Sequence, residues 1–225
     1  AILFLEGHLT TNTGANPSSL LQPTFDNFAY APHFYDTVAL GAHLFTGLTT
    51  ATDLGFYNMS NKAAEWDVPW LLGEFGMHAD TVNVEAYMDL QYARLDDNLA
   101  SGTQWNYTPN WTEENKDGWN HEDLSVVDDQ GQMRTLFRVR AYPRRIPGEP
   151  ISFSADESAV ALSWEHDPAK GEAVIFAPIA EIFESGSATL FVEGSGLSCV
   201  HEDDRLLRCS SEVEGTVSVQ LVASP

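Results

Sequence analysis

Seven polar or aromatic side chains stand where apolar runs of the sequence end. They are Glu6, His33, Tyr35, Glu74, Gln104, Trp105 and Tyr107. In a parallel α/β barrel the reacting groups lie at the carboxyl ends of the strands, so such residues are the first candidates for chemistry. Glu74 is notable because it closes the apolar run 69–73, and burying an unpaired carboxylate is costly. Two interpretations of Glu74 therefore stay open: it is a reactive carboxylate, or it is an ordinary carboxylate at a solvent-exposed strand end.

The elements that must position these side chains alternate between short apolar runs and helical stretches, which is typical of parallel strands joined by helical crossovers. The sequence predicts strands over 1–6, 28–35, 70–75 and 103–107. Apolar residues recur at helical spacing from Val84 to Leu99 and predict a helix there. Further helices are expected within 53–66 and 132–141, the second ended by Pro143. The segment 108–130 is expected to be a long ordered loop.

The pattern changes beyond the Pro- and Gly-rich segment 143–150. Short β-rich runs over 159–164, 173–176, 188–192 and 216–222 are separated by Gly, Ser and Asp, which predicts an all-β module. We therefore expect two domains, 1–148 and 149–225.

Three motifs follow one another in an informative order: His33-Phe-Tyr35, then Gly73-Glu74-Phe-Gly76, then Gln104-Trp105-Asn-Tyr107. Together with the junction 140–148 they resemble the last half of glycoside hydrolase family five, clan A, and most closely its endoglycoceramidase-like members. The resemblance implies an α/β plus all-β fold: half of a (β/α)8 TIM barrel, corresponding to strands five to eight, followed by a C-terminal β-sandwich. It also implies a retaining glycoside hydrolase that acts on β-linked glycosides, with carbohydrate or glycolipid substrates.

The same resemblance assigns roles to individual residues. Glu74 would be the nucleophile, Tyr35 would hold it through its hydroxyl, and His33 would contact the substrate or the partner acid. Trp105 would form an apolar floor under a sugar ring, since aromatic faces pack against the C–H side of sugars. Substrate contacts are also expected from a further group of residues: Gln104, Tyr107, Glu6 and Trp111. Trp111 and Trp119 either line the site or anchor the long loop.

A retaining glycosidase also needs a proton donor, a second carboxyl group about 5 to 5.5 Å from the nucleophile. The family places it in an Asn-Glu motif on the fourth strand, and the 225 residues contain no Asn-Glu dipeptide. We therefore expect pairing with a second copy or with a missing half of the barrel. Glu6 is a substitute candidate, or else a structural carboxylate. There are two alternative hypotheses for this chain. It is a non-catalytic carbohydrate-binding or scaffold remnant of such an enzyme, or it is one piece of a longer enzyme.

The net charge of −22 excludes nucleic acid as a natural partner, because an acidic surface repels phosphate backbones. No apolar run is long enough to predict stable membrane insertion. No cofactor or metal ion is expected, since the histidines show no ligand spacing; His43, His78 and His121 are interpreted as ordinary surface residues.

The two cysteines, Cys199 and Cys209, are spaced like the arms of a hairpin or a small loop. They form either a disulfide, which would indicate a secreted or extracytoplasmic protein, or two reduced thiols that face a core.

Overall fold

The computed structural model describes residues 1–8, 13–112, 114 and 123–225. It divides into two compact units, Ala1–Phe137 and Arg138–Pro225. This division lies before the expected boundary at residue 148, because strand β6 (Tyr142–Arg145) pairs with β9 (Ala173–Phe176) of the second unit. β6 is the last strand of its sheet. Pro143 is tolerated there because an edge strand has one row of backbone groups without a ladder partner.

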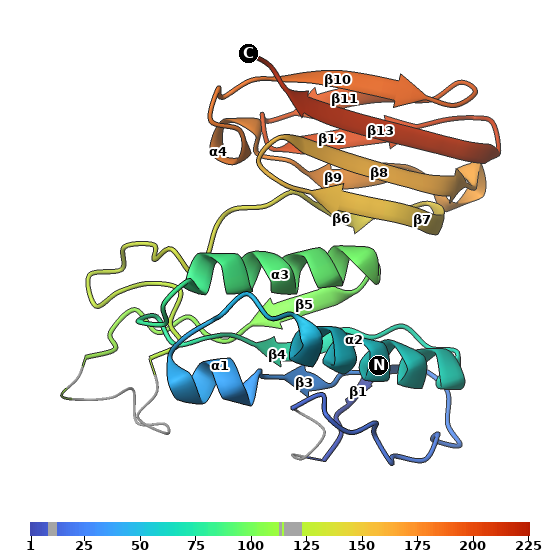
Figure 1. Ribbon diagram of the computed structural model, residues 1–225. Coiled ribbons are helices and arrows are strands. Elements are labelled where there is room, and N and C mark those ends of the chain that lie inside the picture. The colour runs from blue at the N-terminus through green and yellow to red at the C-terminus, as the bar shows by residue number, and fades with distance from the viewer. Residues whose placement is uncertain (9–12, 113, 115–122) are drawn as a thin grey trace. The chain divides into compact units, whose positions relative to one another are not determined.

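The first unit alternates strands and helices along the chain (Figure 1). Its elements are β1 (Leu3–Leu5), β2 (Phe28–Tyr30), β3 (His33–Phe34), α1 (Thr37–Ala42), α2 (Thr50–Trp66), β4 (Leu71–Phe75), α3 (Val84–Asp97) and β5 (Ser101–Gln104). β1 pairs parallel with β2, and β3, β4 and β5 form a parallel sheet. A parallel bridge between Tyr30 and Trp70 connects the two groups. Three of the four expected strands are confirmed with shifted ends, whereas the expected strand 28–35 is divided into β2 and β3, which pair with β1 and β4 respectively.

Helices α2 and α3 pack their apolar residues against one face of these strands. Phe34 of β3, Phe56 of α2 and Phe75 of β4 are all at most 2% exposed and belong to one core cluster. The two helices are also joined by an ion pair from Arg94 Nε to Asp53 Oδ1 at 2.7 Å. The strand face opposite these helices is thus the one free to carry polar side chains.

The helix expected within 132–141 is wrong. In the structure, Asp128 accepts hydrogen bonds from the backbone N–H groups of Gln130 and Gln132, and Gly131 adopts a φ of 75°. A second turn follows, in which the Phe137 N–H donates to the Arg134 carbonyl oxygen at 3.2 Å, and Leu136 of this turn enters the first core at 1% exposure. Turn geometry at Asp128 and Gly131, rather than helical periodicity, therefore determines the path of this segment.

The second unit consists of two four-stranded antiparallel sheets, ordered β10-β13-β8-β7 and β11-β12-β9-β6. Its remaining elements are β7 (Gly148–Ala155), β8 (Ala159–His166), the short 3-10 helix η3 (Pro168–Lys170), α4 (Ile179–Ile182), β10 (Ala188–Glu193), β11 (Ser198–Glu202), β12 (Leu206–Ser210) and β13 (Gly215–Ala223). Trp164, Ile175, Leu207 and Val219, from four strands of both sheets, share one buried cluster. The four strands expected from the sequence are β8, β9, β10 and β13, which the structure confirms.

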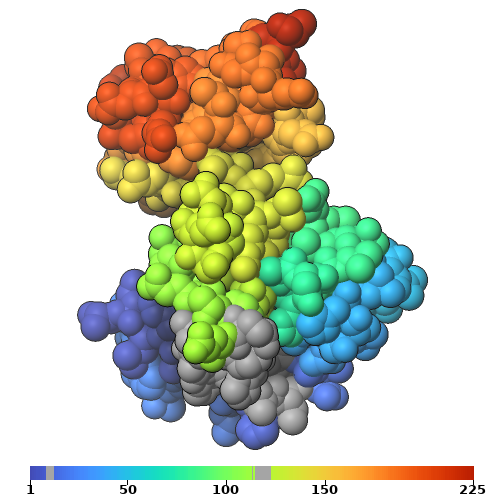
Figure 2. Space-filling model, turned by 90° about the vertical axis from the view of Figure 1, so that its left-hand side faces the viewer, coloured from blue at the N-terminus to red at the C-terminus, as the bar shows by residue number. Residues whose placement is uncertain are grey.

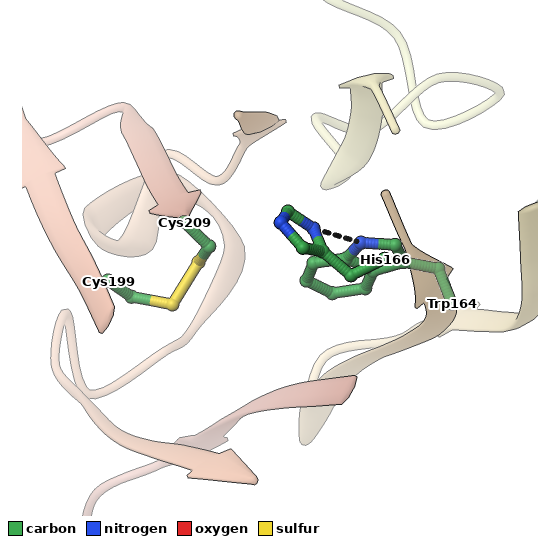
Figure 3. The surroundings of a disulfide bond; sticks show 4 residues. All are labelled: Trp164, His166, Cys199 and Cys209. Atoms are coloured by element: carbon green, nitrogen blue, oxygen red, sulfur yellow. Dashed lines mark hydrogen bonds between the residues drawn. A yellow bond between two sulfur atoms is a disulfide. The ribbon is translucent and has the colours of Figure 1, made fainter. Parts of the chain in front are cut away.

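Cys199 and Cys209 form a disulfide between directly opposite positions of β11 and β12 (Figure 3). This is the first of the two arrangements that their spacing left open. Nearby, His166 is 1% exposed, and its two ring nitrogens bond to Trp164 Nε1 at 3.2 Å and to the Ser211 carbonyl oxygen at 2.9 Å. The buried polar groups of this unit are thus paired within it.

Among the described residues, no helix combines the length and the apolar character needed to cross a bilayer.

Candidate functional site

A β-bulge in β4 places Glu74 on the face of the sheet opposite the helices. Leu72 pairs with Gly102 and Phe75 with Gln104, so β4 carries one more residue than β5 over this stretch. Leu72 and Phe75 both enter the helix-covered core, at 0% and 1% exposure. The residues between them, Gly73 and Glu74, are therefore turned to the other face. The Glu74 side chain keeps 29% of its surface exposed.

Tyr35 is held beside Glu74 by the turn that leads from β3 into α1. The phenol Oη of Tyr35 donates to Glu74 Oε2 at 3.0 Å. The next residue, Asp36, caps α1 by accepting from the backbone N–H groups of Val38 and Ala39. Because this cap fixes where the helix begins, it also fixes the direction of Tyr35.

The buried phenol of Tyr87 supports the same turn from α3. It accepts from the Asp36 backbone N–H at 3.4 Å and from Gln91 Nε2 at 2.8 Å. Burial raises the pKa of the Tyr87 phenol far above its usual value, so this group remains neutral.

His33 brings a second carboxylate to the same place. Its Nδ1 lies 3.3 Å from Glu74 Oε2 and 3.3 Å from Glu6 Oε1. His33 is paired with Glu74 in the parallel ladder, while Glu6 follows the end of β1. The fold thus unites four of the residues that the sequence predicted, Glu6, His33, Tyr35 and Glu74, from three separate strand ends.

The two glycines that flank Glu74 are required by close contacts. A Cβ atom at Gly73 would lie 2.9 Å from His33 Cδ2, and one at Gly76 would lie 2.3 Å from the Trp105 carbonyl oxygen. The backbone N–H of Trp105 also donates to the Phe75 carbonyl oxygen at 2.8 Å. The Gly-Glu-Phe-Gly motif therefore lets the imidazole and the Trp105 backbone approach the strand that carries Glu74.

Gln104 ends β5, and Trp105 is the next residue. The Gln104 amide is engaged on the helix side, where it accepts from Tyr92 Oη of α3 and donates to the Leu136 carbonyl oxygen at 3.0 Å. Trp105 is half-buried. Its peptide bond to Asn106 is cis. Tyr107 lies beyond them and is 69% exposed.

The chain after β5 reaches the surface of the first unit in Figure 2 (green to yellow-green), with residues near the N-terminus (dark blue) on one side and later residues of the same unit (light blue and turquoise) on the other. Within this segment, Asn106 is tied to Leu124 and Val126 by backbone hydrogen bonds of 3.1 and 2.8 Å. Trp111 is half-buried, and no described group accepts a hydrogen bond from its buried indole N–H. Trp119 and His121 fall outside the described residues.

A further cluster, His43, His78 and Asp80, was not anticipated from the sequence. Its potential ligand atoms all lie within 4.8 Å of one another. The pKa of His78 is lowered because burial disfavours the imidazolium form, and the nearby His43 adds to this effect. The two histidines lie 35 positions apart, on a helix end and on a loop, so sequence spacing gave no signal of their proximity.

Taken together, the geometry provides a partly exposed carboxylate oriented by a phenol and an imidazole. An oriented carboxylate of this kind can act as a nucleophile or as a base.

Comparisons with known proteins agree with this geometry at the level of fold. Structures of endo-glycoceramidase II from Rhodococcus sp. match the whole chain: the ganglioside GM3 complex at 22% identity and a TM-score of 0.76, and the lactosyl-enzyme intermediate at 23% and 0.74. Sterylglucosidase 1 from Cryptococcus neoformans matches 88% of the chain at 17% identity and a TM-score of 0.62. No curated protein sequence matches.

The chain spans about half the length of the Rhodococcus enzyme and 38% of the Cryptococcus enzyme. The first unit therefore has the fold of part of a family 5 TIM barrel. The family model described as cellulase (glycosyl hydrolase family 5) matches residues 2–111, the segment that carries Glu6, His33, Tyr35, Glu74 and Trp105. Residues 2–111 of this chain are thus similar to glycosyl hydrolase family 5.

Proposed function

We propose that this chain supplies the nucleophile of a retaining β-glycosidase, and that the nucleophile is Glu74. The observation that carries the proposal is the convergence of Tyr35 Oη, at 3.0 Å, and His33 Nδ1, at 3.3 Å, on Glu74 Oε2. These contacts fix the carboxylate at a strand end. Among the described residues, none donates a hydrogen bond to Oε1, the oxygen that we assign to the attack.

In the proposed reaction, Glu74 Oε1 forms a bond to the anomeric carbon while the bond from that carbon to the leaving-group oxygen breaks. The leaving group departs with the electron pair and takes up a proton. Water then attacks the anomeric carbon of the glycosyl ester and releases the Glu74 carboxylate. Two inversions at one carbon give net retention.

Glycolipids are the substrate class that we favour. The similar Rhodococcus enzyme was solved in a ganglioside complex, and the similar Cryptococcus enzyme is a sterylglucosidase, so both names indicate sugars joined to apolar aglycones. We propose that the Trp105 indole provides the apolar surface against which a sugar ring packs. We further propose that Tyr107 and Trp111 contact the substrate beyond this ring.

We propose that the proton donor comes from outside the described residues, through a second copy or through a further part of the barrel. Glu6 is held against the same His33 nitrogen as Glu74, so we assign it to orienting His33 rather than to acid catalysis. Among the described strands, β1 pairs with β2 alone, and its Leu3 and Phe4 are 50% and 58% exposed. A further part of the barrel could pair with the open edge of β1 and pack against these side chains.

For the second unit, we propose a β-sandwich domain that supports the catalytic unit in an extracytoplasmic enzyme. Its two antiparallel sheets share one core, which supports the sandwich assignment. The disulfide supports an oxidising compartment.

One experiment tests whether Glu74 is the nucleophile and does not require the proton donor. A 2-deoxy-2-fluoro β-glycoside with a dinitrophenolate leaving group needs no proton donor for departure, because the phenolate is a stable anion. Incubation with the chain should add one glycosyl group, and peptide mapping should place it on Glu74. Glu74→Gln should abolish the adduct. Tyr35→Phe should slow its formation about tenfold, because the carboxylate loses its orienting hydrogen bond.

The alternative, a non-catalytic carbohydrate-binding remnant, rests on the absence of an Asn-Glu dipeptide from the sequence. It predicts that the sugar binds but that no adduct forms. Absence of an adduct on the parent chain, or an equal adduct on Glu74→Gln, would contradict the assignment of Glu74 as nucleophile.

A further inference from the structure

The cluster of His43, His78 and Asp80 has the donor set of a transition-metal site and lies outside the group of residues assigned to the sugar chemistry. Its three ligand atoms lie within 4.8 Å of one another. His43 is the C-cap residue of α1, whereas His78 and Asp80 follow β4. Two imidazole nitrogens and one carboxylate oxygen are typical ligands of zinc and its neighbours in the first transition row.

Backbone hydrogen bonds hold the two parts of this cluster together without help from the side chains. The Val82 N–H donates to the His43 carbonyl oxygen at 3.0 Å, and the Phe45 N–H donates to the Val82 carbonyl oxygen, also at 3.0 Å. A third bond, from the Thr81 N–H to the His78 carbonyl oxygen at 3.0 Å, closes the turn around Asp80. The donor groups are therefore carried by a pre-formed scaffold, which reduces the entropy lost on binding an ion.

The side chains are arranged closely on this scaffold. The imidazole rings of His43 and His78 are stacked, with centroids 4.4 Å apart and an interplanar angle of 9°. His43 Nδ1 lies 2.6 Å from Asp80 Oδ1. His78 is half-buried, while the side chains of His43 and Asp80 are 46% and 74% exposed, so water can reach the cluster and occupy a remaining coordination position.

We propose that His43, His78 and Asp80 bind one divalent transition-metal ion, for which zinc is the best match. Ligand atoms bound to one tetrahedral zinc ion lie about 3.3 Å apart, given metal–ligand distances of about 2.0 to 2.1 Å. The exposed side chains of His43 and Asp80 reach this spacing by rotation. The ion takes the place of the proton between His43 Nδ1 and Asp80 Oδ1. A neutral imidazole then carries its proton on Nε2, whereas an imidazolium releases one proton to solvent. Calcium and magnesium are poor matches because they prefer oxygen ligands.

The place of the site in the chain indicates a structural role. α1 starts immediately after Tyr35 and Asp36 and ends at His43, while His78 lies four residues after Glu74. A bound ion would link the segment that carries Tyr35 to the segment that carries Glu74. The proposal does not depend on glycosidase activity, since it concerns binding and stability alone.

Isothermal titration of the metal-free chain with zinc chloride tests the proposal. We expect one ion per chain and a rise in the midpoint of thermal unfolding as zinc is added, because the ion binds the folded state. His43→Ala and His78→Ala should each weaken binding about tenfold or more, and Asp80→Asn about tenfold. The matched control is His201→Ala on β11, an exposed histidine of the second unit, which should bind zinc as the parent does.

Cobalt provides a second readout that does not depend on stability. A cobalt ion in a site of low coordination number absorbs visible light strongly, and this absorption should appear with the parent and vanish with His43→Ala. If the parent takes up no zinc, or if His43→Ala and His201→Ala bind it equally, the proposal is overturned. Should His78→Ala fail to fold, His43→Ala decides the matter, because the His43 side chain is exposed.

Discussion

Two histidines, one in each unit, are used in opposite ways. His166 in the second unit is 1% exposed and has a single hydrogen-bond partner for each ring nitrogen. His33 in the first unit keeps 19% of its side chain exposed, and one of its nitrogens lies 3.3 Å from two carboxylates. Both ring nitrogens of His166 have a hydrogen-bond partner within the fold, whereas His33 holds two carboxylates close together at a strand end.

The difference extends to the units that carry them. In the second unit, antiparallel sheets enclose an apolar core, and a disulfide joins two neighbouring strands. In the first unit, parallel strands end together, and Glu6, Tyr35 and Glu74 meet around His33. Polar groups that fully satisfy one another stabilise a fold, while groups with remaining hydrogen-bonding capacity are available to a substrate. The comparison therefore assigns chemistry to the first unit and stability to the second.

The largest expected effect comes from replacing the two histidines in turn. His166→Ala leaves the indole N–H of Trp164 and the carbonyl oxygen of Ser211 buried without a partner and should cost about 3 to 4 kcal/mol in the free energy of unfolding. His33→Ala should cost less than about 1 kcal/mol, because its ionic contacts are partly exposed. Urea unfolding measures both. Equal costs would remove the distinction between the two histidines.

The disulfide should contribute the next largest amount. Reducing it, or replacing both cysteines by serine, frees a loop with a sequence separation of 10 residues and should cost about 3 kcal/mol in the chain-entropy treatment. Urea unfolding should show the loss in the second unit, while fluoro-glycoside labelling of Glu74 should continue at the parental rate. Loss of labelling would contradict the assignment of the chemistry to the first unit alone.

Gly76→Ala should have an intermediate effect within the first unit. The new Cβ would lie 2.3 Å from the Trp105 carbonyl oxygen, which is backbone and cannot simply rotate away. We expect a loss of about 2 kcal/mol in stability and slower labelling of Glu74. Gly41→Ala in α1 is the matched control, since its Cβ would meet nothing within 4 Å. A neutral Gly76→Ala would show that the approach of Trp105 is not required.

The smallest expected effect is a pH dependence at His78. Its pKa is lowered in the folded state from 6.5, first by burial, so the unfolded chain binds more protons below that value. Stability should therefore fall as the pH drops below about 6.5, by less than about 1 kcal/mol. His78→Gln should remove this part of the dependence, while His201→Gln should keep it. Urea midpoints between pH 5 and 8 provide the measurement.

The types of neighbouring residues were sufficient to predict much of the secondary structure of this protein. Continuous apolar runs predicted the strands of the first unit, except that the run 28–35 forms two strands, β2 and β3, and β-rich runs predicted four strands of the second unit. The strand predictions are confirmed where strand patterning is a property of neighbouring residues. Polar residues at the ends of those runs predicted a site that includes Glu6, His33, Tyr35 and Glu74, and the structure brings these four residues together.

Other features required the tertiary structure. Gln104 ends a strand as Glu74 does, yet its amide is bonded to Tyr92 and Leu136 on the helix side, because a bulge in β4 sets which face each residue takes. The cluster of His43 and His78 joins a helix end to a loop 35 positions away. The end of the first unit at Phe137 depends on the pairing of β6 with β9. These three features depend on contacts between residues that are far apart in the sequence. The local sequence pattern does not specify which distant residue a side chain contacts.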